Sequence, residues 1–419
     1  MRKNIWKTLV AITGALAMAG CLDGAPSGGG GGGGGGGTGG GTGGGTGGGT
    51  DPGTGGGTTG GTPQPPAEDP NLAARTIDYG QALRTASLKL VGSLPTMDEQ
   101  AAVTDAASYS AQIDKYLADT RFPGKLQSYF QDMMKMGGQI TVIQGQNNVK
   151  VSLDTAPTFA SELVVQDRPF TDLFTAATNT CPTLDPATGT FTDAVCAVAN
   201  GLTTSGVLSD PGAMAQFYSN MAFRRVRWVQ ETFVCTRFPA EYSPTPVAMG
   251  NGQYVSPWPF DSITGGTDPT VAPINFKDTS SVVCANCHTT MNHIAPLFAQ
   301  FNTLGVFQTT IQVQTPVPMT PITKLTDWLP SGQGLSWRFQ KPVTDLPSLG
   351  VAIAADPDVA NCQVARAWNW AMSKTDIVND LSTVPASTIS TLETQFQSNG
   401  YKLKPVLKAI FTHDDFVKF

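Results

Sequence analysis

The chain has 419 residues, 47 of them glycine, and a formal net charge of −6 at pH 7. An acidic surface disfavours contact with phosphate backbones, so we expect no nucleic-acid partner. About 350 residues follow the glycine-rich region, which is enough for one large domain or two ordinary ones.

Residues 1–20 predict a lipoprotein signal peptide. A cationic start is followed by an apolar stretch, Leu9 to Ala19, that is too short to span a bilayer. The stretch ends in Met-Ala-Gly before Cys21, which resembles the bacterial lipoprotein box, so we expect Cys21 to be lipidated. The alternative is an ordinary signal peptide followed by an incidental cysteine.

Residues 21–66 predict a flexible tether, because a Gly/Thr-rich run cannot bury apolar surface and stays disordered. Its typical reach is roughly 35–40 Å. Lipid on Cys21 would then anchor the folded part to a membrane of the bacterial cell envelope without spanning it. We expect the outer membrane, and the sequence leaves open whether the protein faces the periplasm or the cell surface.

The folded part predicts a mainly α protein, with a soft boundary in a long Pro/Gly-rich loop at 239–280. The predicted divisions are an N-terminal helical domain at 67–240, a middle region at 241–345 and a C-terminal helical block at 346–419. Strand patterns are confined to 139–143 and 310–314. One predicted helix begins after Thr96, where Glu99 completes a capping box. The other helical patterns cover 82–90, 109–119, 123–136, 157–166, 211–235, 281–301, 346–355, 359–373, 387–399 and 402–411.

The most specific motif lies in the middle region, where Cys284, Cys287 and His288 stand in the string CANCH. This C-x-x-C-H pattern is typical of c-type haem attachment: two thiols bond to one haem edge, and the next residue places an imidazole under the iron. A bare disulfide and a zinc site with His288 or His293 are the alternatives. Zinc fits less well, because the side chains of adjacent residues diverge.

His288 is the expected proximal ligand of this haem c, and the sixth ligand must come from another segment. Met319 is our candidate, because it lies on a Pro-stiffened loop, with Met249 second. An axial methionine favours pure electron transfer, whereas an open sixth position would favour a peroxidase-like haem enzyme.

A basic cluster in the predicted helix at 211–235 comprises Arg224, Arg225 and Arg227. These cations either neutralise haem propionates or form a solvated helix face with at least one structural ion pair.

The remaining cysteines number four once Cys21 and the C-x-x-C-H pair are set aside, which predicts two disulfides in an exported chain. Cys181 and Cys196 enclose a short segment rich in turn residues, so a local bridge is the simplest pairing. Cys235 and Cys362 would then tie the N-terminal helices to the C-terminal ones. Free buried thiols are the alternative for each pair.

Several strings, taken in order, are similar to blocks of one family. They are LRTASL (83–88) with GSLPT (92–96), RRVRWV (224–229) with Cys235, CANCH (284–288) with FNTLG (301–305), and a helical end around Cys362. Together they resemble the planctomycete-type cytochrome c proteins, large envelope proteins that are also frequent in myxobacteria. The resemblance spans roughly residues 80–419 and implies a cytochrome c-like helical haem region at 241–345.

The chain departs from this family after the haem motif, where the family's Asp-Pro-x-Gly is replaced by NHIA (292–295). The leading hypothesis is a lipid-anchored electron carrier with a single haem c and an unknown redox partner protein, rather than an enzyme. The alternatives are a haem enzyme with an open sixth position and a haem-free binding or scaffold lipoprotein with a vestigial motif.

Overall fold

The computed structural model describes most of the chain after residue 73. Arg75 to Phe419 form one compact unit. The signal peptide, Cys21 and the tether lie outside the described residues. The described ranges are 74–196, 201–235, 247–249, 252–254, 282–313, 329, 332–338, 341–375 and 384–419.

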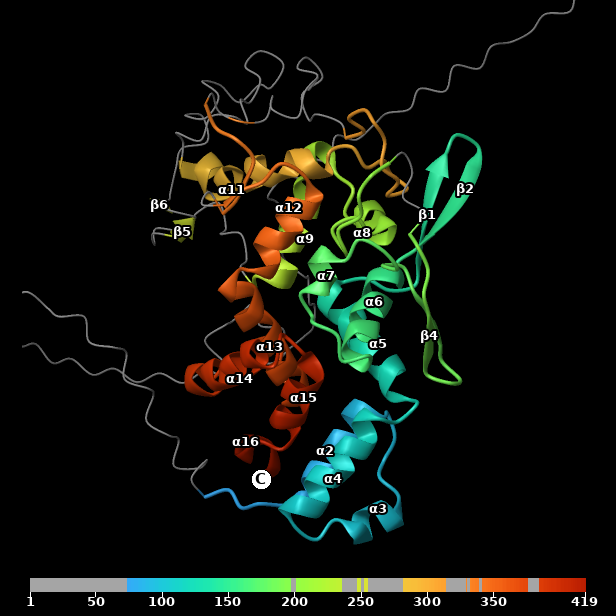
Figure 1. The fold of residues 1–419 in the computed structure, drawn as a ribbon, viewed down its shortest axis with the longest axis vertical. Coiled ribbons are helices and arrows are strands. Elements are labelled where there is room, and N and C mark those ends of the chain that lie inside the picture. Colours follow the sequence, from blue (N-terminus) through green and yellow to red (C-terminus); the bar gives the residue numbers. More distant parts are fainter. Residues whose placement is uncertain are drawn as a thin grey trace, which may run out of the picture. The chain divides into compact units, whose positions relative to one another are not determined.

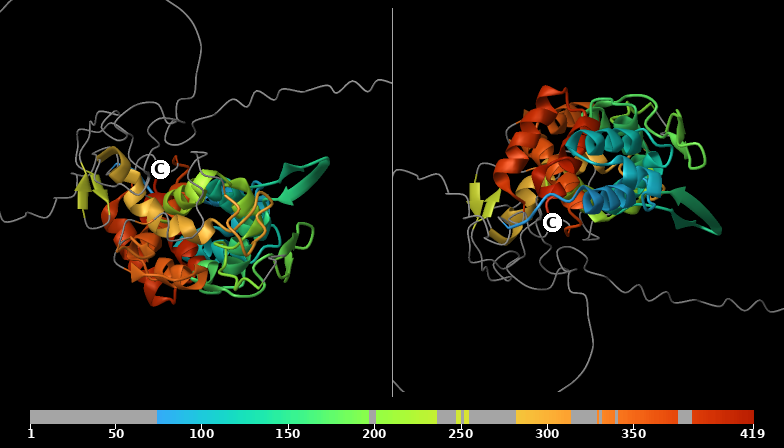
Figure 2. Two further views of the ribbon diagram at one scale, coloured as in Figure 1. Left: turned by 90° about the horizontal axis from the view of Figure 1, so that it is seen from above. Right: turned by 90° about the horizontal axis from the view of Figure 1, so that it is seen from below.

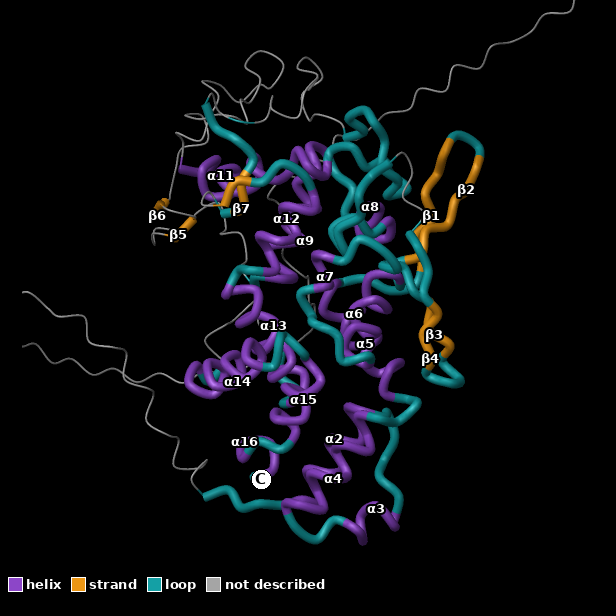
Figure 3. The backbone as a smooth tube through the Cα atoms, viewed as in Figure 1, coloured by secondary structure: helices purple, strands orange, loops and turns teal. Residues whose placement is uncertain are grey.

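The described unit is mainly α-helical, which confirms the prediction of a mainly α protein, and its strands are short (Figures 1 and 3). The predicted capping box is present, because Thr96 and Glu99 each accept a hydrogen bond from the other's backbone amide. The helices that open the unit are α2 (Tyr79–Leu90), α3 (Met97–Ala102), α4 (Ala106–Leu117) and α5 (Phe122–Met134).

A β-hairpin after α5 extends away from the helices (Figures 1 and 2). Its first strand, β1 (Gln139–Gln144), was predicted, and it pairs antiparallel with β2 (Asn147–Ser152). The second strand was not predicted, because most residues of β2 are polar and the alternation of apolar and polar side chains that indicates a strand is weak there. The chain continues into α6 (Thr155–Val165), which packs against α5 and is buried along most of its length, and then into the short α7 (Asp172–Thr175).

The prediction of one helix over 211–235 is wrong. The structure has α8 (Pro211–Gln216) and α9 (Phe223–Phe233), with a tight turn between them. The backbone at Met221 and Ala222 is left-handed, with φ values of 53° and 57°, which a continuous right-handed helix cannot contain. No Gly or Pro marks this break, so the apolar periodicity runs through it.

The described part of the middle region centres on α11 (Val282–Phe298). A small hairpin of β5 (Val247–Met249) and β6 (Gly252–Tyr254) contacts α11, and the rest of the loop predicted at 239–280 lies outside the described residues. The predicted strand at 310–314 is wrong over its described residues. There the amides of Gln312 and Val313 donate to the Ala299 carbonyl just beyond α11, so the segment caps a helix end instead.

The predicted C-terminal helices are confirmed. They are α12 (Leu346–Ala354), α13 (Pro357–Ala371), α14 (Ala386–Ser398) and α15 (Leu403–Phe411), followed by a short α16 (Asp414–Val417). Two very short strands, β7 (Ser336–Trp337) and β8 (Lys341–Pro342), precede α12.

The two ends of the compact unit meet. Thr76 and Phe419 exchange backbone hydrogen bonds of 3.1 and 3.0 Å, and the Tyr109 hydroxyl donates to the Phe411 carbonyl at 2.8 Å. One cluster of buried apolar side chains includes residues of both the N-terminal and the C-terminal helices. The division at 240/241 and 345/346 stays a prediction.

Both predicted disulfides are confirmed. Cys181–Cys196 closes a short loop, with a sequence separation of 15, around the hairpin of β3 (Thr183–Asp185) and β4 (Thr190–Thr192). Cys235–Cys362 has a separation of 127 and joins the residues after α9 to the middle of α13.

Glu162 on α6 is a buried carboxyl whose side chain is 0% exposed. Burial, together with the nearby Asp193 carboxylate, raises the pKa of Glu162 from 4.5 to about 7. Arg168, 4.0 Å away, and a hydrogen bond from Gln166 oppose this rise without cancelling it. The fold therefore favours the protonated form of Glu162.

We expect the two disulfides to stabilise the fold unequally. The double variant Cys235→Ala/Cys362→Ala should lower the free energy of unfolding by about 4–5 kcal/mol, and Cys181→Ala/Cys196→Ala by about 3 kcal/mol, because the longer loop loses more entropy when closed in the unfolded chain. Urea denaturation of both variants measures the difference. A larger loss from the shorter loop would contradict this account.

Glu162 should make stability depend on pH. Since its folded pKa is about 7 and its ordinary value is 4.5, its contribution is complete below about pH 4.5 and is lost as the pH rises through 7. Between pH 5 and 8 the wild type should lose about 2 kcal/mol more unfolding free energy than Glu162→Gln. Asp98→Asn, at an exposed site on α3, is the control and should keep the wild-type dependence.

Candidate functional site

The three residues of the C-x-x-C-H motif lie on one element. Cys284, Cys287 and His288 fall in the first half of α11, at helix positions i, i+3 and i+4. Positions three and four apart lie on the same side of an α-helix, so the backbone brings these positions together. Met319 and Cys21 lie outside the described residues, and the structure therefore does not place them next to the motif.

The second half of α11 is embedded in the core. The side chains from Met291 to Phe298 belong to the buried set at almost every position, and Asn292, Ile294 and Phe298 are 0% exposed. Because burial extends around the whole helix, this half has no solvated face. The motif therefore lies on a helix whose following turns are held by packing on all sides.

The His293 side chain is buried and hydrogen-bonded in the described structure. It is 3% exposed, and its Nε2 lies 2.8 Å from Oε1 of Gln333. Whether Nε2 donates or accepts in this contact depends on the tautomer of the ring. A zinc ion bound at Nε2 of His293 would have to displace this hydrogen bond.

Arg225 of α9 fixes the C-terminal end of α11. Its guanidinium is fully buried and donates to backbone carbonyls at the ends of two helices. The acceptors are Met214 of α8 at 2.9 Å, Phe298 of α11 at 2.6 Å, and Phe301 and Asn302 just beyond α11 at 3.1 and 3.2 Å. The last carbonyls of a helix have no partner within the helix, so this side chain satisfies groups that would otherwise be buried unbonded.

Arg225 stays charged at neutral pH, although none of the described carboxylates is bonded to it. Burial lowers the pKa of Arg225 to about 9, which is still above neutral pH. The guanidinium carbon lies 5.3 Å from the centre of the Tyr218 ring and 5.9 Å from that of Phe301. Aromatic faces attract a cation, and they complete its environment together with the carbonyl oxygens.

A tight turn follows α11 and packs on the start of α8. The side chain of Asn302 accepts from the amides of Leu304 and Val306 at 2.9 and 3.0 Å. Gly305 has a φ of 71°, and a Cβ there would lie 1.8 Å from the Pro211 carbonyl oxygen. Only glycine fits this position, so the turn and α8 approach each other at backbone distance.

The basic cluster predicted from the sequence is divided by the fold. Arg225 is buried as described, whereas Arg224 and Arg227 are exposed. Nε of Arg227 lies 2.9 Å from Glu231, one turn later on α9. The cluster therefore combines a structural buried cation with a solvated face that carries an ion pair. Sequence reasoning missed the role of Arg225, because its acceptors are carbonyls up to 77 positions away along the chain.

Within the described ranges, one group of side chains has the spacing of metal ligands, namely Cys181, Cys196 and Asp210. The two sulfur atoms are joined in a disulfide, so neither is a thiolate that could bind a metal. Asp210 caps α8 by accepting from the Ala213 amide at 2.8 Å, and burial raises its pKa to about 6. The group is thus a covalent crosslink beside a helix cap.

Neither a protein-family model, nor a curated protein, nor a solved structure matches this chain. In the part of the chain that the structure describes, no helix has the length and apolar character needed to cross a bilayer.

Replacing Arg225 tests its role at the end of α11. Arg225→Met keeps an apolar stem but leaves the buried carbonyls without their donor, so the free energy of unfolding should fall by about 3–5 kcal/mol. Hydrogen exchange should rise first in the last turn of α11. Arg224→Met, the exposed neighbour, should change stability by no more than about 0.5 kcal/mol. Similar losses in the two variants would exclude a special role for Arg225.

Proposed function

We propose that this protein is a lipid-anchored envelope protein that carries one covalent c-type haem and transfers electrons. The observation that carries the proposal is the placement of Cys284, Cys287 and His288 at i, i+3 and i+4 on the single helix α11. Two thiols and an imidazole within five residues are the donor set that attaches haem c and supplies a proximal ligand. When bound, the haem takes up and releases one electron.

The setting of α11 supports this role. Its second half is buried, and its end is bonded to Arg225. A proximal imidazole must keep its position and orientation in both oxidation states, and a helix held by the core provides that rigidity. The motif itself precedes these buried turns, in the part of the helix nearest the loop at 239–280.

The disulfides support an oxidising compartment. Structural disulfides form and persist in the periplasm and outside the cell, and two are present here. This agrees with export by the signal peptide at 1–20 and with lipid on Cys21. The glycine-rich tether would then give the folded unit a reach of roughly 35–40 Å from the membrane.

The sixth ligand of the proposed haem decides whether the protein is an electron carrier or a catalyst. We propose Met319 on the basis of its Pro-stiffened loop. Met249 is the rival, because its strand β5 contacts α11. A methionine in this position would favour electron transfer to a partner protein, whereas an open position would admit small ligands and peroxidase-like chemistry.

The proposal is tested by an absorption spectrum of the purified mature protein. Sharp α and β bands should appear on reduction, and the haem should remain on the chain after denaturation, because it is bonded to two cysteines. The double variant Cys284→Ala/Cys287→Ala should lose the covalent haem. Cys181→Ala/Cys196→Ala removes two cysteines elsewhere and should retain it.

A colourless mature protein from a host that attaches haem c would refute the proposal and leave the scaffold hypothesis. If haem is present, cyanide binding to the wild type identifies the open-position alternative. If the wild type excludes cyanide, the methionine variant that newly admits it, Met319→Leu or Met249→Leu, identifies the sixth ligand.

A further inference from the structure

The two disulfides differ in how far solvent reaches them. Cys235 and Cys362 are each 2% exposed and belong to the buried core, whereas Cys181 is partly exposed and its partner Cys196 is 4% exposed. Thiol–disulfide exchange begins when a thiolate attacks one sulfur of the bond, so it requires access to that sulfur. Of these four cysteines, Cys181 is therefore the one that a thiol of another molecule reaches most readily.

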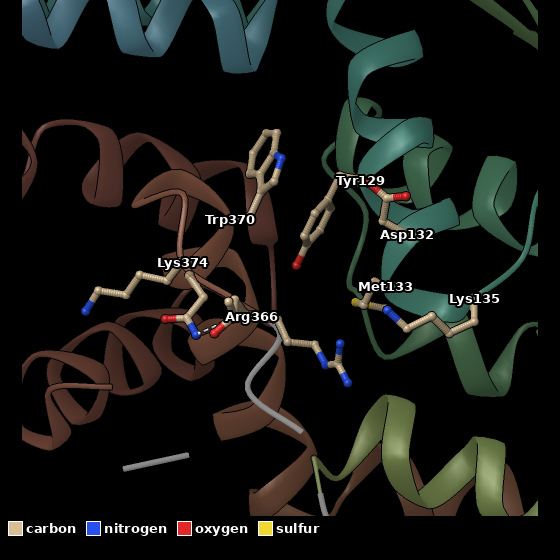
Figure 4. A pocket seen from close by; sticks show the side chains of 9 residues that line it. Tyr129, Asp132, Met133, Lys135, Arg366, Trp370 and Lys374 are labelled. Atoms are coloured by element: carbon tan, nitrogen blue, oxygen red, sulfur yellow. Dashed lines mark hydrogen bonds between the residues drawn. The ribbon is translucent and has the colours of Figure 1, made fainter. Parts of the chain in front are cut away.

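The surroundings of the Cys235–Cys362 bond suit a permanent crosslink. Sγ of Cys235 lies 3.8 Å from the Cys362 carbonyl, and Sγ of Cys362 lies 3.7 Å from the Thr232 carbonyl. Carbonyl oxygens only accept hydrogen bonds, so they do not stabilise a thiolate released from this bond. Arg366, one turn after Cys362 at the cleft between α5 and α13, donates to the Glu231 carbonyl at 2.8 Å and also holds α13 to α9 (Figure 4).

The Cys181–Cys196 bond has a hydrogen-bond donor at one of its sulfur atoms. Thr180 is 2% exposed, and its Oγ1 lies 3.1 Å from Sγ of Cys196. A sulfur in a disulfide carries no hydrogen, so the hydroxyl is the donor in this contact. When the bond breaks, the same hydroxyl stabilises the negative charge on the departing sulfur, which makes Cys196 the better leaving group.

The other sulfur of this bond faces an acceptor. Oδ2 of Asp210, a residue that is 1% exposed, lies 3.8 Å from Sγ of Cys181. The other polar neighbours of this carboxyl are the Thr155 hydroxyl and the amides of Gly212 and Ala213. Since its pKa is about 6, Asp210 is mainly a carboxylate at pH 7. The intact disulfide has no proton to donate to Oδ2, whereas the S–H group of a reduced Cys181 would donate one.

We propose that the Cys181–Cys196 disulfide is a thiol–disulfide exchange site whose substrates are the thiols of other molecules. Each sulfur already has the partner that its reduced state needs, namely an acceptor for the Cys181 thiol and a donor for the Cys196 thiolate. The sulfur atoms of Cys235–Cys362 face carbonyl acceptors, and that bond stays a structural crosslink.

The exchange takes place in two steps. A substrate thiolate attacks Sγ of Cys181, a new S–S bond forms, and the electron pair of the broken bond leaves on Cys196 beside the Thr180 hydroxyl. A second substrate thiolate then attacks the substrate sulfur of this mixed disulfide and releases Cys181. Two thiols are thereby oxidised to one disulfide, and their two protons pass through solvent to Cys181 and Cys196, which are reduced to thiols. The Cys181 thiol then donates to Asp210.

Mixtures of reduced and oxidised glutathione test the site in the purified mature protein at pH 7. Free thiols are trapped by alkylation, and mass spectrometry of the peptides scores each cysteine separately. The Cys181–Cys196 pair should become reduced reversibly as the share of reduced glutathione rises, while Cys235–Cys362 stays oxidised, because structural disulfides resist reduction by glutathione. If Cys181–Cys196 also stays oxidised, or if both bonds open together, the proposal is wrong.

Two variants separate the exchange chemistry from exposure alone. Asp210→Asn should fold, because asparagine caps a helix as well as aspartate does, but the loss of the carboxylate acceptor should lower the equilibrium constant for reduction roughly ten-fold. Asp345→Asn removes the cap carboxylate of α12 and should keep this constant within about two-fold. Thr180→Val keeps the shape of the side chain without its hydroxyl and should slow reduction roughly five-fold. A wild-type equilibrium in Asp210→Asn, or a wild-type rate in Thr180→Val, would overturn the proposal.

Discussion

The described fold depends on one buried cation. Arg225 bonds to carbonyls at the ends of α8 and α11, two helices with residues 217–281 between them in the sequence. Helix ends leave carbonyls without partners, and in a core these groups need a donor from elsewhere. A planar guanidinium with several N–H groups meets carbonyls from two directions at once, which an ammonium cannot do in the same geometry. Arg225 therefore sets where α11 ends, and with it the position of the motif that α11 carries.

The tight turn after α11 strengthens this link. Gly305 lets the turn approach the start of α8 at backbone distance, so α8 and α11 are joined both by packing and by the shared guanidinium.

How far the sequence predicts a structural feature depends on how many positions separate the residues that form it. The capping box at Thr96 and Glu99 and the amphipathic helices were predictable, because the responsible residues lie within a few positions of one another. The break at Met221 and Ala222 carries no glycine or proline and could not be foreseen from periodicity. The role of Arg225 also could not, because its acceptors are backbone atoms whose position follows only from the packing of distant helices. The C-x-x-C-H motif was readable at once, whereas the residues that would complete a haem site around it come from distant segments and are not a local property of the sequence.

The disulfide between Cys235 and Cys362 has a topological consequence for the motif. The covalent loop that it closes contains Cys284, Cys287 and His288, together with the long Pro/Gly-rich stretch at 239–280. A protease that cuts one peptide bond anywhere inside this loop produces two fragments that remain attached to each other through sulfur. A single nick in this loop therefore does not release the segment bearing α11 from the N-terminal part of the chain.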